Sequence, residues 1–397
     1  MRALFTTHPG FGHFHPLVPL ARALQQAGHD VAFASAAAFL PVFAANGFRG
    51  FAAGVDWSAL GGGSLEDMQK RQASLGADPS ARRAFMAEMF INQFGRRMLP
   101  DLIAVCHEYA PDVIIRDSVE FAGCIAAEHL GIPHASLQVG AGHPSFLRAK
   151  EVAVHLDALR ATVGLGADPA VEMLHRYLHL TFAPPLYFAE QPLPPTVHCL
   201  QPAVFDQSGE EGLPPWTDSL GARPIVYATL GTVFNKLFHP FSAIAAGLAD
   251  AEVELVMTVG RDLDPAAFGP QPPHIHIERY IPQTLLFPRC RAAILHGGYN
   301  SVIAALWHGL PLVIVPLAAD QPLNAERCRQ LGVAQVVPLS ELTPARVRAA
   351  LETVLGDPSY KRNAERFQAA ARSLPDITHA VELLARLTAD KQPVLRS

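Results

Sequence analysis

The chain has 397 residues, of which 50% are hydrophobic and 17% are charged, and its formal net charge is −5. This length exceeds what a single hydrophobic core usually serves, so we expect two domains. The composition excludes a disordered chain. Because the lysines and arginines form no dense run, we do not expect a nucleic-acid partner.

The five cysteines are scattered and never have the C-x-x-C spacing. This pattern favours free thiols in a reducing compartment over a disulfide framework or a zinc site. No segment approaches the roughly 18 apolar residues that a membrane span needs, and the first residues lack the pattern of a secretory signal. We therefore expect a cytoplasmic protein without stable membrane insertion.

The beginning of the chain has the pattern of a β-α-β unit. Residues 2–7 form an apolar run that predicts a buried strand, and a turn rich in glycine and histidine follows at 8–15. Pro16 stands at a plausible first position of a helix, whose apolar residues recur at helical spacing up to Leu24. Gly28 ends this helix, and residues 30–34 read as the next strand. Such a unit predicts a parallel sheet covered by helices.

The pattern continues after a segment, residues 54–80, that we interpret as a long surface loop. An apolar stripe at helical spacing follows at residues 85–94, and stripes of this kind usually face a core. A strand is predicted at 112–115, a helix at about 120–130 and a further strand at 134–137.

Residues 205–224 combine proline, glycine and acidic residues, which marks a domain boundary. Beyond it, strands are predicted at 225–230, 254–259, 292–295 and 312–315, with a helix at 239–249. The α/β architecture therefore occurs twice. The predicted fold consists of two Rossmann-like, doubly wound parallel-sheet domains that face a cleft.

A glycine turn in the second half is a candidate phosphate site. The sequence His-Gly-Gly-Tyr-Asn-Ser at 296–301 follows a predicted strand and opens a helix. The amides at a helix start stabilise a diphosphate without a metal ion. An ordinary capped turn is the alternative. Asp320 and Gln321 lie just beyond the next strand, at the sheet edge where ligands bind, and they suit sugar hydroxyls.

Three segments resemble the GT-B-fold glycosyltransferases that act on antibiotics, macrolides and plant natural products. They are residues 280–324, the Gly-His-x-x-Pro turn at 12–16 and the Thr-Leu-Gly-Thr turn at 229–232, and the resemblance covers almost the whole chain. It implies an acceptor domain at 1–205, a linker at 206–224, a nucleotide-sugar domain at 225–375 and a C-terminal helix at 376–397 that packs back on the first domain. The implied donor-binding residues are Thr232, Tyr280, Ile281, Gln283, His296, Gly298, Asn300, Ser301, Asp320 and Gln321.

Two positions depart from the family's pattern. Tyr280 stands where a tryptophan usually stacks on the base, and Ala319 stands where an aromatic residue is common before the aspartate. These departures concern the base and the sugar of the donor, and they leave the implied phosphate site unchanged.

His13 is the implied catalytic base, because the family's base lies three residues before the proline that starts the first helix. His8 and His15 are then structural or pocket-lining. A single histidine in a turn is more often structural, but Asp117 follows a strand that should end at the same sheet edge. The resemblance pairs these two residues. A hydroxyl is a poor nucleophile unless its proton is removed, and a histidine oriented by a carboxylate suits that task.

The predicted function is inverting transfer of a hexose from a nucleoside-diphosphate sugar to a hydroxyl of a small apolar or aromatic natural product. A UDP-glucose-like donor is the first choice and a dTDP-sugar the second, and neither a metal ion nor a cofactor is expected. By resemblance, Phe85, Met89 and Phe90 border the acceptor pocket. The alternatives are a nucleotide-sugar epimerase of the same fold and a catalytically silent sugar-nucleotide binding partner. The acceptor, the type of linkage and the oligomeric state stay open.

Overall fold

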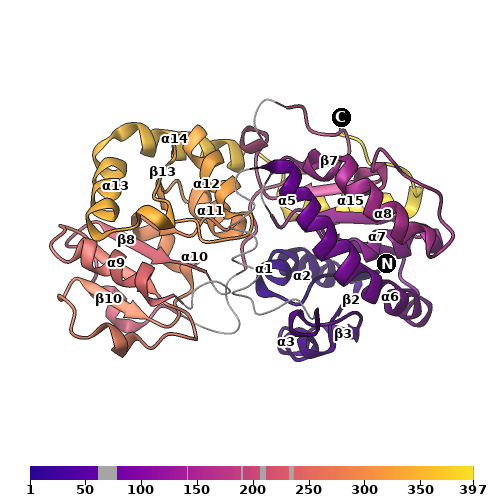
Figure 1. Ribbon diagram of the computed structural model, residues 1–397, viewed down its shortest axis with the longest axis horizontal. Helices are drawn as coiled ribbons and strands as arrows, with labels where there is room; N and C mark the ends of the chain where they lie inside the picture. Colours follow the sequence, from indigo (N-terminus) through magenta and orange to yellow (C-terminus); the bar gives the residue numbers. More distant parts are fainter. Residues whose placement is uncertain (61–77, 141, 189–190, 206–211, 232–236, 397) are drawn as a thin grey trace. The chain divides into compact units, whose positions relative to one another are not determined.

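The computed structural model describes residues 1–60, 78–140, 142–188, 191–205, 212–231 and 237–396. The chain forms two compact units, residues 1–205 with 374–397 and residues 206–373. Each unit contains one parallel sheet flanked by helices, which confirms the predicted fold class (Figure 1). In the described part of the chain, no helix is long and apolar enough to cross a membrane.

The sheet of the first unit has seven parallel strands in the order β3-β2-β1-β4-β5-β6-β7. The strands are β1 (Arg2–Thr6), β2 (Asp30–Ser35), β3 (Arg49–Ala52), β4 (Val113–Asp117), β5 (His134–Leu137), β6 (Leu178–Thr181) and β7 (Val197–Cys199). The helices and helical turns are α1 (Phe11–Phe14), η1 (His15–Leu17), α2 (Val18–Gln26), η2 (Ala37–Phe39), α3 (Leu40–Ala45), η3 (Trp57–Leu60), α5 (Pro79–Met86), η4 (Ala87–Gly95), α6 (Arg96–Tyr109), α7 (Ala122–Leu130), η5 (Pro144–Leu147), α8 (Lys150–Ala161), η6 (Glu172–His175), η7 (Pro185–Phe188) and α15 (Ile377–Asp390).

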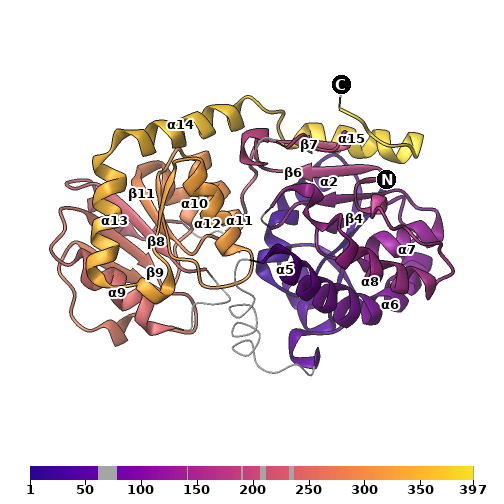
Figure 2. The same cartoon turned by 45° about the horizontal axis from the view of Figure 1, so that its top comes forward.

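Both faces of this sheet are covered, as the nearly continuous apolar strands require. Leu102, Ile125 and Leu156, from α6, α7 and α8, belong to the core on one face. The core on the other face includes Leu20 of α2 and Leu384 of α15. The C-terminal helix α15 packs against α2, so the end of the chain belongs to the first unit (Figure 2).

The chain becomes helical earlier than the sequence pattern predicts. Helix α1 begins at Phe11, after Gly10 in extended conformation, and η1 follows with Pro16 near its start. His13 therefore lies on a short helix and not in an open turn. The reason is local: the first turn of a helix tolerates proline, so Pro16 lies near the start of η1, the helical turn that directly follows α1.

The second unit has six parallel strands in the order β10-β9-β8-β11-β12-β13. They are β8 (Ile225–Thr229), β9 (Glu254–Thr258), β10 (Ile275–Glu278), β11 (Cys290–Leu295), β12 (Leu312–Ile314) and β13 (Ala334–Val336). The helices and turns are η8 (Pro215–Ser219), α9 (Phe238–Leu248), η9 (Pro265–Phe268), α10 (Gln283–Leu286), η10 (Phe287–Arg289), α11 (Tyr299–Trp307), α12 (Gln321–Gln330), η11 (Leu339–Glu341), α13 (Pro344–Gly356) and α14 (Pro358–Arg372). Helices α9 and α13 contact each other and contribute to one core of this unit.

Part of the segment expected as a linker belongs to the second unit. Residues 206–211 lie outside the described residues. The following turn η8 is tied down, because Arg289 donates to the carbonyls of Thr217 and Leu220 at 2.7 and 3.1 Å. The ring of Trp216 also stacks on His276, with 4.4 Å between centroids.

Each sheet has one point where the strand order reverses, and ligands of open α/β sheets bind at the carboxyl ends of the strands there. In the first unit this point lies between β1 and β4, which pair directly. In the second unit it lies between β8 and β11. Asp117 is the last residue of β4, and the chain segments that follow β1, β8 and β11 contain His13, Thr232 and His296.

Candidate active site

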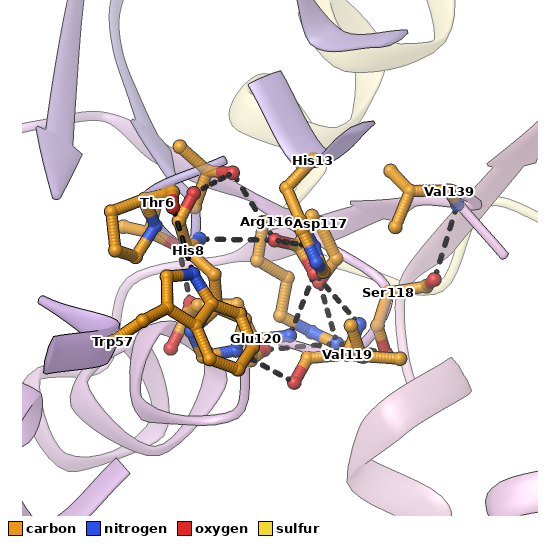
Figure 3. A network of polar contacts seen from close by, with 12 residues as sticks. Thr6, His8, His13, Trp57, Arg116, Asp117, Ser118, Val119, Glu120 and Val139 are labelled. Atoms are coloured by element: carbon orange, nitrogen blue, oxygen red, sulfur yellow. Dashed lines mark hydrogen bonds and ion pairs between the residues drawn. The ribbon is translucent and has the colours of Figure 1, made fainter. Parts of the chain in front are cut away.

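His13 and Asp117 are in direct contact at the reversal point of the first sheet (Figure 3). Nδ1 of His13 lies 3.2 Å from Oδ2 of Asp117; the histidine side chain is 21% exposed and the carboxylate is fully buried. Because Nδ1–H donates to the carboxylate, Nε2 is left with a lone pair. No described residue hydrogen-bonds to Nε2. The arrangement suits proton abstraction by a histidine whose tautomer is set by an aspartate.

The Asp117 carboxylate accepts hydrogen bonds on both oxygens. Oδ1 accepts from the amides of Val119 and Glu120 at 2.9 and 2.8 Å. Oδ2 accepts from the hydroxyl of Thr7 and the amide of His8, both at 3.2 Å, in addition to His13. Burial alone would raise the pKa of Asp117, but the attraction of His13 and these donors lower it well below its usual range. The carboxylate is therefore ionised at neutral pH.

His8 is a buried neighbour of the pair. Its Nε2 lies 3.1 Å from the carbonyl of Val119, and its ring lies 5.4 Å from that of His13. Burial lowers the pKa of His8 to about 4, even though Asp117 acts in the opposite direction. His8 is therefore neutral at pH 7 and only a weak base.

Aromatic rings adjoin the two histidines. Phe90 lies 4.9 Å from His8 and 6.1 Å from His13 between ring centroids. Phe94 and Trp57 pack on the same side of His8, and the indole nitrogen of Trp57 donates to the carbonyl of Pro9 at 2.8 Å. Phe90 and Phe94 both belong to η4, a π-helical segment, and such segments are frequent at functional sites.

The three residues expected to border the acceptor do not all meet His13. Phe90 is the one whose contact with the His13 ring is observed. Phe85, on α5, and Met89, on η4, are half-buried on the same helical run.

The glycine turn of the second unit surrounds His296. A Cβ atom on Gly231 or Gly298 would lie 2.7 or 2.5 Å from Nε2 of His296, so the imidazole occupies space that only glycines leave open. Burial lowers the pKa of His296 to about 4, and a hydrogen bond with the Thr229 backbone opposes that shift only in part. The ring is therefore a neutral hydrogen-bonding group at pH 7.

The start of helix α11 has no capping side chain. Gly298 is the N-cap residue, and Asn300 and Ser301, both half-buried, lie in the first turn. A helix start of this kind presents backbone amides and a partial positive charge. The arrangement has the chemistry that binds the phosphates of a nucleotide.

Asp320 and Gln321 lie at the start of α12 and are attached to the glycine turn. The fully buried Asn324 donates from Nδ2 to the carbonyl of Gly297 at 2.7 Å and to Oδ2 of Asp320 at 3.0 Å. Oε1 of Gln321 accepts from the amides of Leu317 and Ala318, so this oxygen stabilises the backbone just before α12. The side-chain amide of Asn324 thus hydrogen-bonds both to the Asp320 carboxylate and to the glycine turn.

The remaining expected donor residues lie on the segment after β10. Tyr280 is 46% exposed, Ile281 is buried, and Gln283 begins α10. Thr232 lies outside the described residues. Among the described residues, no group of three or more histidine, cysteine, aspartate or glutamate side chains is arranged to hold a metal ion.

Sequence reasoning missed several residues of these sites. Thr7 and the backbone of His8 contact Asp117 only because β1 and β4 are neighbours, which no local pattern reveals. Trp57 lies in a segment interpreted as loop, where an isolated tryptophan was the available signal. Asn324 lies one helical turn after Asp320, a spacing that predicts proximity on a helix.

Comparisons with known proteins show which family the chain resembles. The profile of the family described as "UDP-glucoronosyl and UDP-glucosyl transferase" matches residues 167–375. That of "Erythromycin biosynthesis protein CIII-like, N-terminal domain" matches residues 22–162. L-demethylnoviosyl transferase of Streptomyces niveus is 30% identical over 92% of this chain and 93% of its own length. The 4'-demethylrebeccamycin synthase of Lentzea aerocolonigenes is 26% identical over 97% of this chain and 99% of its own.

A solved structure, that of glycosyltransferase VinC in complex with dTDP, has a TM-score of 0.80 and 26% identity, covering 98% of this chain and 100% of that chain. The two parallel-sheet α/β units of this chain have the fold of that glycosyltransferase. The chain belongs to the UDP-glucoronosyl and UDP-glucosyl transferase family. It is a glycosyltransferase, and the epimerase and the silent binding protein are not favoured.

Proposed function

We propose that the chain transfers a hexose, with inversion, from a nucleoside-diphosphate sugar to a hydroxyl of a small apolar or aromatic natural product. The observation that carries the proposal is the His13–Asp117 contact beside the ring of Phe90. A base with a free lone pair next to aromatic rings suits an acceptor that has both an apolar body and a hydroxyl.

In the proposed reaction, Nε2 of His13 takes the proton of the acceptor hydroxyl as its oxygen attacks the anomeric carbon. The bond to the diphosphate breaks on the opposite face, so an α-linked donor gives a β-linked product. The buried carboxylate of Asp117 stabilises the imidazolium that forms and holds the ring in position. A positioned general base supplies on the order of 10²–10⁴ in rate.

The leaving diphosphate is proposed to lie at the start of α11, with help from Thr232. Because His296 is neutral, it contributes a hydrogen bond and the helix start contributes the positive potential. Hydrogen bonds to charged groups are worth about 1.5–3 kcal/mol each. We propose that these contacts make a metal ion unnecessary.

We propose that Asp320 and Gln321 hold the sugar of the donor. Tyr280, Ile281 and Gln283 are proposed to hold its nucleotide base. A relative named for a deoxysugar, the aclacinomycin-T 2-deoxy-L-fucose transferase of Streptomyces galilaeus, and the dTDP complex of VinC favour a dTDP-linked donor. The half-buried carboxylate of Asp320 equally suits a fully hydroxylated hexose, so UDP-glucose belongs in the same test. All five cysteines are free thiols, which fits the proposed cytoplasmic location.

A mass-spectrometric screen tests the proposal. UDP- and dTDP-sugars are incubated with the protein and a panel of phenols and macrolides, with and without excess EDTA. We expect a product one hexosyl or deoxyhexosyl unit heavier than its acceptor, formed equally with the chelator, whose anomeric configuration by NMR is opposite to that of the donor. Conversion of the sugar nucleotide without acceptor would indicate an epimerase. Loss of activity in EDTA that Mg²⁺ or Mn²⁺ restores would overturn metal independence.

A further inference from the structure

Arg116, the residue before Asp117 on β4, is among the largest fully buried side chains of the described chain. Only 1% of it is exposed, and no carboxylate of a described residue lies within 4.0 Å of its guanidinium. Burying a cation without a paired anion costs several kcal/mol. An apolar residue would fill a central strand at lower cost, so the arginine calls for an explanation beyond packing.

The guanidinium is enclosed by the turn that carries Asp117 (Figure 3). Nη1 donates to the carbonyls of Asp117, Ser118 and Glu120 at 3.1, 3.0 and 3.1 Å. Nη2 donates to the carbonyl of Leu174 at 3.3 Å, while Nε has no hydrogen-bond partner among the described residues. Three carbonyls of one turn thus converge on a single nitrogen atom.

The amides of the same turn hold the carboxylate. Oδ1 of Asp117 accepts from the amides of Val119 and Glu120, while Oδ2 faces His13. The turn is also attached to the segment that follows β5, because the hydroxyl of Ser118 accepts from the amide of Val139 at 3.2 Å. A rotation of the turn that released the guanidinium would therefore move the amides that orient Asp117.

We propose that Arg116 is a positioning residue of the His13–Asp117 pair: its buried guanidinium holds the 117–120 turn in the conformation that directs Oδ2 of Asp117 at Nδ1 of His13. It acts through the carboxylate and touches no substrate. The kinetic part of the proposal rests on the proposed function, in which His13 is the base. The structural part, the tautomer of His13, does not.

A double-mutant cycle tests the kinetic part. We expect Arg116→Met to lower kcat by about tenfold or more with little change in the donor KM, and Arg116→Lys to recover part of the loss because an ammonium also donates to carbonyls. In an Asp117→Asn background the same Arg116→Met change should cost less than about twofold, since the carboxylate on which it acts is gone. Equal losses in both backgrounds would overturn the proposal.

Arg160 provides a matched control. It is a buried arginine of the same unit, 5% exposed, and pairs with Glu128 at 2.6 Å. Arg160→Met should lower the free energy of unfolding. It should not change the ratio between kcat of the protein with Asp117 and kcat of the Asp117→Asn variant. If Arg160→Met and Arg116→Met behave alike in this cycle, Arg116 has only a structural role.

NMR of ¹⁵N-histidine-labelled protein gives a readout that does not depend on transfer activity. The His13 signals, assigned from their loss in His13→Ala, should show the Nδ1–H tautomer in the wild type and a mixture with Nε2–H in Arg116→Met. Arg116→Lys serves if the methionine variant does not fold, and it should give a smaller change. If the wild type transfers no sugar but the tautomer of His13 still changes in Arg116→Met, the proposed function is disproved and the inference stands. An unchanged tautomer in folded variants would overturn it.

Discussion

His13 and Asp117 are 104 positions apart in the sequence, yet Nδ1 of the histidine lies 3.2 Å from Oδ2 of the aspartate. The donor is partly exposed and the acceptor is fully buried. The pair therefore has one face toward the protein, which fixes it, and one toward solvent, where Nε2 can receive a proton.

His13→Ala should lower turnover by about a hundredfold or more, because the base acts in the transition state. Binding of nucleoside diphosphate, which is assigned to the other unit, should change little. Steady-state kinetics and calorimetry measure the two quantities. Unchanged turnover in a folded variant would remove His13 from the mechanism.

Asp117→Asn should lower turnover less than His13→Ala, because the imidazole remains while its orientation and the charge that stabilises the imidazolium are lost. The amide also places an NH₂ group against buried donors, so a loss of about 1–3 kcal/mol in the free energy of unfolding is expected. Kinetics at saturating donor and urea denaturation check these two effects. A larger kinetic loss than in His13→Ala would assign the aspartate a different role.

Asp320→Ala should weaken binding of the intact sugar nucleotide and leave that of free nucleoside diphosphate almost unchanged. His296→Ala and Ser301→Ala should weaken the free diphosphate, by about 1.5–3 kcal/mol for each lost bond to a charged group. Calorimetry with both ligands separates the two sets. Gln321→Glu is the better probe of Gln321 than alanine, because it keeps the oxygen that accepts from Leu317 and Ala318. If Asp320→Ala weakens free diphosphate as much as His296→Ala does, the assigned division fails.

Asn324→Leu should affect both parts of the donor site together. Its amide bridges the Gly297 carbonyl and the Asp320 carboxylate, and leucine, which has the same branching and the same number of side-chain heavy atoms, removes both hydrogen bonds. We expect weaker binding of free diphosphate and of sugar nucleotide alike, measured by calorimetry, with a fall in stability of about 1–3 kcal/mol. A defect confined to the sugar nucleotide would show that the Gly297 contact is dispensable.

Glu120 gives a pH-dependent prediction for stability. It is fully buried, and burial raises the pKa of its carboxyl from 4.5 to about 7. Between these values the folded state binds the proton and the unfolded state does not, so the contribution of this group to stability falls as pH rises from about 4.5 to 7. Glu120→Gln removes this term.

Relative to wild type, Glu120→Gln should therefore gain up to about 3 kcal/mol in the free energy of unfolding between pH 4.5 and pH 8. Urea denaturation of both proteins at these pH values measures the gain. Taking the difference between the two proteins cancels the histidines that titrate in the same range. A difference that does not vary with pH would show that Glu120 has an ordinary pKa.

Local patterns were sufficient for much of the fold. The apolar run at the start predicted β1, and the residues around His134 predicted β5 at the observed bounds. The glycine turn at 296–301 was predicted to open a helix, and α11 begins at Tyr299. These features follow from backbone conformation and side-chain period within a few residues, which a sequence displays directly.

The sequence by itself therefore determined the type of the elements with a clear local pattern, such as β1, β5 and α11, the presence of two α/β halves and, through resemblance, His13 and Asp117 as partners. Only the tertiary structure decided that Arg116 is buried beneath the Asp117 turn and that Trp57 contacts Pro9. It also decided that one amide of Asn324 joins Gly297 to Asp320. The physical reason is that such contacts depend on which strands and loops are neighbours in the sheet, and this order is selected by the packing of whole units and not by the residues next to each site.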